Sequence, residues 1–200
     1  MEKVELKKGI YWVGAIDWNI RDFHGYSTPY GTTYNAYLIL DEKNVLVDTV
    51  KAPFYLEMLG RISEIIDPSR IDVVVSNHVE MDHSGSLTQM VERIGNPTVI
   101  TSERGQKGLT KHYNKKSLKF RTVKSGETFS VGHRTLTFFN RESFHVSPNG
   151  KNFARRLLVL KICTCCLKCF FQYATGTSNI GFKYRPVTEF SLWATCSGVP

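Results

Sequence analysis

A strand-like run that stops abruptly at a cluster of ionisable residues limits what this chain can fold into. Three consecutive valines at 73–75 are typical of a strand buried on both faces, and Gly85 with Ser86 favours a turn into a helix. Four ionisable residues lie between strand and turn, within six positions: His78, Glu80, Asp82 and His83. Because functional side chains gather where buried strands of α/β proteins end, this stretch predicts an α/β fold with a site in the connecting loop.

Alternation of strand-like and helical patterns extends over most of the first 140 residues. Hairpin-like runs come first and strand–helix alternation follows, which favours a mixed rather than a purely parallel sheet. Strands are expected at Ile10–Ala15, Tyr34–Leu40, Asn44–Val47, Asp72–Ser76, Thr98–Thr101, Leu118–Val123 and Arg134–Phe139. Helices are expected after Pro53, at Ser86–Ile94 and at Glu103–Tyr113. Residues 141–152 are predicted to form a loop, and no confident element is assigned beyond residue 156.

The ionisable cluster has the composition of a metal site. Positions 78, 80 and 82 alternate along a loop that we expect to be extended, so their side chains can converge from one side. One imidazole and two carboxylates suit iron, manganese or zinc better than copper. A solvated polar loop is the alternative for an isolated His-x-Glu pair, but the surrounding strand and turn favour a metal site.

The motif His78-x-Glu80-x-Asp82-His83-Ser84-Gly85 resembles the signature of the flavodiiron proteins, metallo-β-lactamase relatives that reduce dioxygen or nitric oxide. Glu80 distinguishes it, since hydrolases of the same fold carry His at that position. The resemblance extends to residues 11–18, 21–26 and 31–37 and covers roughly residues 1–140. It implies a metallo-β-lactamase-like αβ/βα sandwich with mixed sheets, incomplete in its C-terminal half, and a non-haem diiron site to which FMN of a flavodoxin module supplies electrons.

The resemblance assigns roles to individual residues. It implies that His78 and Glu80 bind one iron and that Asp82 binds the other, and that His145 completes the first iron site. His83 would bind metal in the hydrolases of this fold but generally does not in flavodiiron proteins.

Two further residues have supporting roles by the same resemblance. His24 would position or protonate the bound gas, the alternative being an ordinary surface histidine, and Asp48 would brace the metal loop. His112 and His133 are expected to be exposed bystanders.

The resemblance breaks down in the last third of the chain. The flavodiiron pattern requires a bridging Asp and a further His after the position of His145, yet Asp82 is the last Asp and His145 the last His. Residues 141–200 hold eight Lys or Arg against two acids, and they contain all five cysteines. We therefore divide the chain into residues 1–150, the start of a diiron domain, and 151–200, a divergent Cys-rich basic tail. Loss of the reading frame near His145 explains this tail; a zinc or iron–sulfur element at Cys163, Cys165, Cys166 and Cys169 is the alternative.

These observations predict a fragment of a flavodiiron-type oxidoreductase that is inactive as this chain. The alternatives are a metal-dependent hydrolase of the metallo-β-lactamase superfamily and a non-catalytic metal-binding fragment. The expected partners are O2 or NO, an electron donor such as rubredoxin or a flavodoxin-like domain, and a second copy in a homodimer. The net charge of +8 lies mostly in the tail, so we expect no nucleic acid. The start of the chain lacks a signal-peptide layout and no apolar run is long enough to span a membrane, which predicts a cytoplasmic protein.

Overall fold

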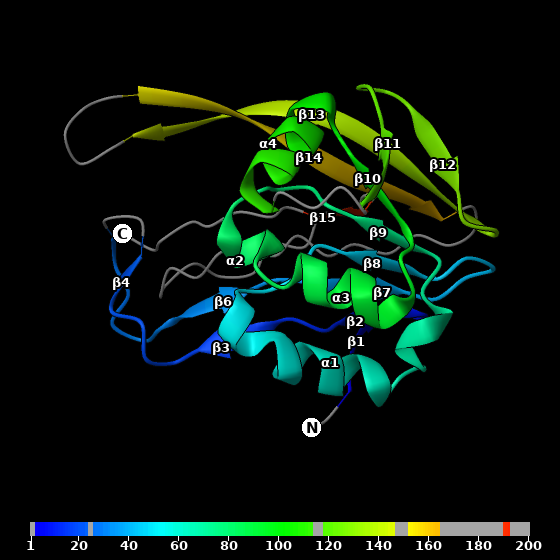
Figure 1. Cartoon of the computed structure of the whole chain (residues 1–200), viewed down its shortest axis with the longest axis horizontal. Helices are drawn as coiled ribbons and strands as arrows, with labels where there is room; N and C mark the ends of the chain where they lie inside the picture. The colour runs from blue at the N-terminus through cyan, green and yellow to red at the C-terminus, as the bar shows by residue number, and fades with distance from the viewer. Residues whose placement is uncertain (1–2, 24–25, 114–117, 147–151, 165–189, 193–200) are drawn as a thin grey trace, which may run out of the picture.

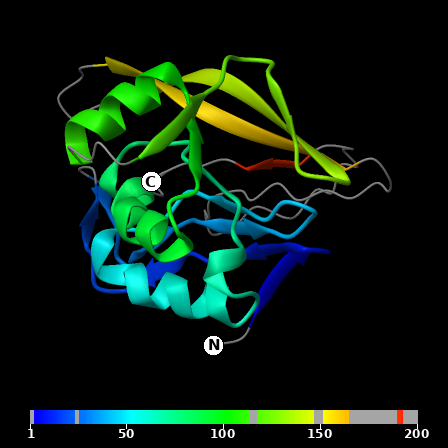
Figure 2. The ribbon, with the colours of Figure 1, turned by 45° about the vertical axis from the view of Figure 1, so that its right-hand side comes forward.

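Two β-sheets lie face to face, and helices cover the outer face of the larger sheet (Figure 1). The computed structural model describes residues 3–23, 26–113, 118–146, 152–164 and 190–192. Two clusters of buried apolar residues separate the layers. One lies between the helices and the large sheet, and the other lies between the two sheets. Figure 2 shows the three layers from a second direction.

The large sheet is mixed, as the sequence predicts. Its strand order is β1-β2-β7-β8-β9-β10-β11; β1, β2, β7 and β8 pair antiparallel, and β8 to β11 pair parallel. The valines of β9 lie between β8 and β10 at its centre. The strands are β1 (Val4–Lys7), β2 (Ile10–Trp12), β7 (Tyr37–Ile39), β8 (Val45–Val47), β9 (Val73–Val75), β10 (Thr98–Thr101) and β11 (Lys119–Thr122).

The alternation of side chains in the large sheet explains why both of its faces are apolar. Leu46 and Val74 point to the helical layer, whereas Val45 and Val75 point to the second sheet. That second sheet has the order β12-β13-β14-β15, and two small antiparallel pairs, β3-β6 and β4-β5, form separate sheets. These strands are β3 (Ala15–Asp17), β4 (Asp22–Phe23), β5 (Tyr26–Ser27), β6 (Thr32–Tyr34), β12 (Thr128–Ser130), β13 (Arg134–Val146), β14 (Asn152–Thr164) and β15 (Phe190–Leu192).

Helices α3 and α4 begin and end within one residue of the predicted bounds, and a helical segment begins around Pro53 as predicted. Pro53 lies in the short helix η1, which leads directly into α1, and Gly95 ends α3 in the left-handed conformation with φ 100°. No helix within the described segments is long and apolar enough to cross a membrane. The helices are η1 (Ala52–Phe54), α1 (Tyr55–Ser63), η2 (Pro68–Arg70), α2 (Met81–Ser84), α3 (Leu87–Ile94) and α4 (Glu103–Tyr113).

Three expectations about local structure are wrong. The sequence predicts a loop at residues 141–152, but β13 continues to Val146 and β14 begins at Asn152, with His145 opposite Phe153 in an antiparallel ladder. Polar and charged residues on these strands hid the pattern, because cross-strand pairing rather than apolar alternation defines them. The predicted strand Ile10–Ala15 is instead divided between β2 and β3, with the break at Val13 and Gly14. The predicted strand Tyr34–Leu40 is divided in the same way between β6 and β7, with the break at Asn35 and Ala36.

Candidate metal centre

The candidate site begins at the C-terminal end of β9. The backbone N–H of Ser76 still donates to the carbonyl of Ile100 on β10 at 2.9 Å, and the Thr101 hydroxyl donates to the Ser76 carbonyl at 2.8 Å. These bonds hold the chain to the sheet up to Asn77. The residues that follow therefore leave the sheet at its carboxyl edge from a fixed point, as the sequence predicts.

Asp48 supports this loop from behind. Its carboxylate accepts hydrogen bonds from the Asn77 backbone N–H at 2.7 Å and from the Asn77 side-chain amide at 3.3 Å. Burial of the carboxyl group raises the pKa of Asp48, and the neighbouring His83 and the bonds from Asn77 act in the opposite direction. Asp48 itself has a positive φ of 57°, a conformation that Asp tolerates better than most residues. Its position agrees with the bracing role that the resemblance implies.

The loop is not extended throughout, contrary to expectation. Residues 81–84 form the single turn α2, in which the Glu80 carbonyl accepts from the backbone N–H groups of His83 at 2.9 Å and Ser84 at 2.8 Å. Asp82 therefore lies on a helical turn, and strict alternation holds only between His78 and Glu80. The turn forms because Gly85 continues it in a right-handed helical conformation, donating to the Met81 carbonyl at 2.9 Å.

The predicted ligands form two adjoining pairs. His78 Nε2 lies 3.2 Å from Glu80 Oε2, and His83 Nε2 lies 3.3 Å from Asp82 Oδ2. The rings of His78 and His83 connect the pairs, with centroids 5.4 Å apart, and His83 Nδ1 lies 3.7 Å from Asp48 Oδ2. Two donors bound at about 2.1 Å to one ion lie about 3.0–3.4 Å apart, so the His78–Glu80 spacing fits a shared metal ion.

The donor chemistry fits iron or zinc, because imidazole nitrogen and carboxylate oxygen are ligands that both metals accept. Within the described segments, no group of three His, Cys, Asp or Glu side chains is arranged to hold one ion. The backbone of His145 lies on β13, while the role predicted for its side chain is outside what the structure describes. His24 lies outside the described residues, and its predicted role stays a prediction.

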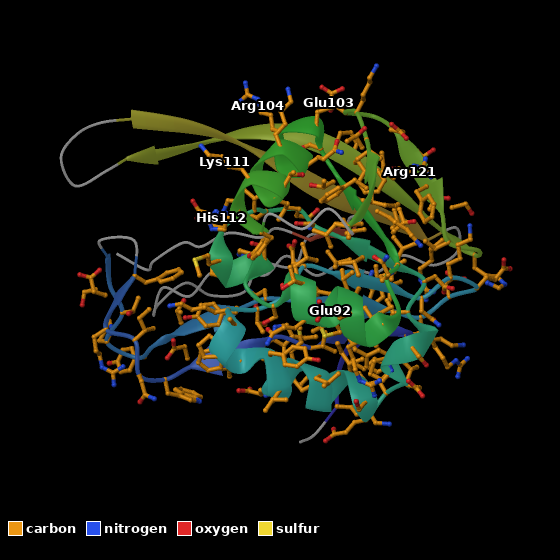
Figure 3. The ribbon with its side chains drawn as sticks, viewed as in Figure 1. Glu92, Glu103, Arg104, Lys111, His112 and Arg121 are labelled. Atoms are coloured by element: carbon orange, nitrogen blue, oxygen red, sulfur yellow. The ribbon has the colours of Figure 1, made fainter. Side chains whose placement is uncertain are left out.

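A cavity of about 700 Å³ lies beside the pairs. Glu80 and Asp82 form part of its wall. Lys51, which directly precedes η1, and the C-terminal half of α4 form further parts. The sequence did not single out Lys51 or Lys111. His112 is exposed, as expected, and it also borders this cavity; Figure 3 shows it beside Lys111 at the C-terminal end of α4. The lining residues are Phe23, Lys51, Val79, Glu80, Met81, Asp82, Gly108, Lys111 and His112.

His133, the other expected bystander, lies far from this loop. Its side chain is 83% exposed, and its ring Nδ1 lies 3.1 Å from the carboxylate of Asp41. It is thus exposed but paired, and its partner belongs to the turn between β7 and β8. His133 takes no part in the candidate metal centre.

Comparison with known proteins identifies the architecture. The sequence pattern of the ODP family beta lactamases matches residues 32–160, which include the whole ionisable cluster and His145. The chain belongs to this family. The resemblance to flavodiiron proteins is confirmed over about 70% of the chain, and so is the metallo-β-lactamase-like α/β fold.

Three relatives illustrate the match. The chain is 47% identical to the rubredoxin-oxygen oxidoreductase of Megalodesulfovibrio gigas over 146 residues, which are 72% of this chain and 36% of the relative. It is 44% identical to a nitric oxide reductase of Moorella thermoacetica over 72% of this chain and 37% of that protein. The crystal structure of the flavodiiron protein from Giardia intestinalis superposes with a TM-score of 0.66 at 38% identity, covering 69% of this chain and 34% of that one. This ODP-family chain thus spans little more than a third of the length of these relatives.

Proposed function

We propose that this chain carries part of the diiron centre of a flavodiiron-type oxidoreductase that reduces dioxygen or nitric oxide. The observation that carries the proposal is the 3.2 Å separation of His78 Nε2 and Glu80 Oε2 at the end of a central strand. The proposal draws further support from relatives that are named as an oxygen oxidoreductase and a nitric oxide reductase. These names describe those proteins, so both gases remain candidates here.

In this proposal His78 and Glu80 hold one iron, Asp82 lies toward the second, and His145 adds the next ligand to the first. Ferrous iron would supply electrons and an open coordination position for the gas. The protein contributes a fixed loop in which His78 and Asp82 are 8% and 4% exposed, whereas Glu80 is more accessible from the cavity. Asp48 keeps the loop in place through Asn77.

As a separate polypeptide, the chain is proposed to be inactive and to hold fewer than two irons. No Asp follows Asp82 and no His follows His145, so the chain offers no residue of either type for the remaining positions of the flavodiiron pattern. The shared ligand of a diiron pair is what keeps two cations at short distance despite their repulsion. Without it, we expect one site of moderate affinity.

The remaining partners are also proposals. We infer that electrons come from FMN in a flavodoxin-like domain or from a rubredoxin-type donor, in line with the name of the M. gigas relative. A homodimer and a cytoplasmic location stay predictions. None of these affects the metal-binding claim, which concerns only residues of this chain.

Anaerobic titration with Co²⁺, followed by its visible absorption, tests the site. Wild-type protein should bind Co²⁺ saturably, and Glu80→Gln should weaken binding at least about 10-fold because an ionised ligand is replaced by a weak neutral one. Glu92→Gln is the matched control, since Glu92 is exposed and lies on α3 rather than on the metal loop (Figure 3). Equal affinity of wild type and Glu80→Gln would overturn the proposal.

The same Co²⁺ titration, applied to a His83 variant, distinguishes the proposed function from the hydrolase alternative. His83 is buried beside Asp82, as a ligand in a hydrolase of this fold would be, which keeps that alternative open. A hydrolase needs His83 as a ligand, so His83→Gln should abolish its metal binding, whereas the flavodiiron arrangement predicts a smaller loss than for Glu80→Gln. Hydrolysis of an activated ester by the zinc-loaded chain would favour the hydrolase.

A further inference from the structure

The side chain of Tyr113 reaches the candidate metal loop from the last residue of α4. Its hydroxyl donates a hydrogen bond to the carbonyl of Ser84 at 2.6 Å and also lies 2.8 Å from the Ser84 hydroxyl. The two residues are 29 positions apart and belong to different helices. In Figure 1 the C-terminal end of α4 lies next to α2.

Hydrogen bonds of Ser84 connect Tyr113 to the backbone of Glu80. The Ser84 side chain is buried, and its hydroxyl lies within donating distance of the carbonyls of Val79 at 2.8 Å and Glu80 at 3.0 Å. A serine hydroxyl has one proton, so these two carbonyls and the Tyr113 oxygen share it. The phenol, the serine hydroxyl and the backbone on both sides of Glu80 therefore form one hydrogen-bond network.

The turn that carries Asp82 needs such support from outside. Helix α2 has four residues, and no side chain caps its N-terminus. A single turn of helix is unstable by itself, because nucleation fixes several torsions for one hydrogen bond. On the other side, Thr49 holds the turn by donating its backbone N–H at 2.8 Å and its hydroxyl at 2.9 Å to the His83 carbonyl. Thr49 and Tyr113 thus donate hydrogen bonds to two consecutive carbonyls of α2, those of His83 and Ser84.

We propose that Tyr113 is a positioning residue for metal binding, which acts through Ser84 to fix the backbone between Val79 and Ser84. In this way it sets the direction of the Glu80 and Asp82 carboxylates. The phenol hydroxyl bonds to Ser84, so its effect on the two carboxylates is one of geometry. This inference rests on the proposed metal site and adds a residue that the His78–Ser84 motif does not contain.

Tyr113→Phe tests the inference, because it removes only the hydroxyl. Tyr11→Phe is the matched control: it also deletes a hydrogen-bonded phenol hydroxyl, which contacts Glu5, but on β2, a strand that β7 and β8 separate from β9. Co²⁺ affinity should fall about 10-fold in Tyr113→Phe, as for other residues that orient metal ligands, with a changed visible spectrum of the bound ion. Tyr11→Phe should bind within about twofold of wild type.

Two further variants show whether the effect passes through Ser84. Ser84→Ala should weaken Co²⁺ binding, because it removes the hydroxyl that bonds to the carbonyls of Val79 and Glu80. Tyr113→Phe should weaken binding further in that background, because the bond from the phenol to the Ser84 backbone carbonyl survives Ser84→Ala. The loss in the double variant should still be smaller than the sum of the two single losses, because both changes remove the contact between the two hydroxyls. Fully additive losses would contradict a network that passes through the Ser84 hydroxyl.

Thermal unfolding of the metal-free proteins separates positioning from mere structure. A folded Tyr113→Phe protein with unchanged Co²⁺ affinity and spectrum overturns the inference, whatever its Tm. If Tyr113→Phe does not fold, Ser84→Ala decides in the same assay, and unchanged affinity overturns the inference. Failure of the proposed function is visible separately, since wild-type protein would then lack Co²⁺ binding that Glu80→Gln weakens.

Discussion

Asp48 combines a backbone role and a side-chain role in one residue. It adopts φ 57° directly after β8, and its carboxylate receives the Asn77 backbone N–H. Asn shares with Asp the tolerance of this conformation and keeps one acceptor oxygen, whereas Ala does neither. The two substitutions therefore measure different contributions.

We predict that Asp48→Ala lowers the free energy of unfolding by about 2–4 kcal/mol, because it leaves a buried N–H unpaired and forces Ala into a left-handed conformation. Asp48→Asn should cost about 1 kcal/mol or less. Urea unfolding of both variants at neutral pH checks this. Equal losses in the two variants would show that neither the acceptor nor the backbone conformation matters.

The sequence predicted some residues of the candidate site and missed others for a physical reason. His78, Glu80, Asp82 and His83 were found because they follow one strand within six positions. Tyr113 was not, because its contact with Ser84 joins two helices and leaves no local pattern. Lys51 was also missed, since a single lysine before a helix is usually solvated.

Among the elements, the break between β2 and β3 shows a constraint that the strand pattern concealed. A Cβ atom on Gly14 would lie 2.1 Å from the Tyr34 carbonyl oxygen and 2.9 Å from the Trp12 indole. Strand residues on either side read as one continuous run, so the sequence predicted one strand where the close approach of β6 requires two. Gly60 in α1 is the opposite case, because a Cβ atom at that position would meet nothing within 4 Å.

We expect Gly14→Ala to lower the free energy of unfolding by at least about 3 kcal/mol, since the backbone must move to admit the methyl group. Gly60→Ala should instead raise it by about 0.5–1 kcal/mol, because Ala reduces the freedom of the unfolded chain at a helical position with free space. Differential scanning calorimetry measures both. A stabilised Gly14→Ala protein would contradict the close packing of β2, β3 and β6.

The elements near the site were predicted unequally well. Strands β9 and β10 and helices α3 and α4 appeared within a residue or two of their expected ends, because apolar periodicity and turn residues mark them. Helix α2 was missed because four residues are too few to show a helical period. The first half of β13 was predicted at Arg134–Phe139, but its continuation to Val146 and the whole of β14 were missed. Polar and charged residues are frequent where these two strands continue, and the pairing of such residues depends on the partner strand.

At the scale of the whole molecule, one carboxylate links the two sheets. Asp41, in the turn after β7, accepts from the backbone N–H of His133 at 2.9 Å and from Arg134 Nη1 at 2.9 Å. Arg134, at the start of β13, also donates to the carbonyls of Lys8 at 2.6 Å and Leu40 at 2.9 Å. Burial opposes ionisation of Asp41, but the hydrogen bonds from His133, Glu42 and Arg134 outweigh it and lower its pKa to about 2.

Stability should depend on the ionisation of Asp41. A folded-state pKa of about 2, below the ordinary 3.8, means that the stabilisation is complete above pH 3.8 and is lost as the pH falls toward 2. Asp41→Asn should lower the free energy of unfolding by about 2 kcal/mol at neutral pH. This difference from wild type should fall by roughly half at about pH 3. Glu42 is the next residue and is exposed, so Glu42→Gln should unfold with the same free energy as wild type at both pH values. Urea unfolding at pH 7 and at about pH 3 measures these differences. A difference between Asp41→Asn and wild type that does not change with pH would contradict the dependence of stability on the ionisation of Asp41.

The central claim, that the His78–Glu80 end of β9 is a metal site left incomplete in this chain, is tested most directly by counting irons. The protein is loaded anaerobically with excess Fe²⁺, desalted and analysed for iron per chain, beside Glu80→Gln and Glu92→Gln. The account predicts wild-type iron content well below two per chain, a lower content in Glu80→Gln, and an unchanged content in Glu92→Gln. Two tightly held irons per chain, or an iron content that Glu80→Gln leaves unchanged, would contradict it.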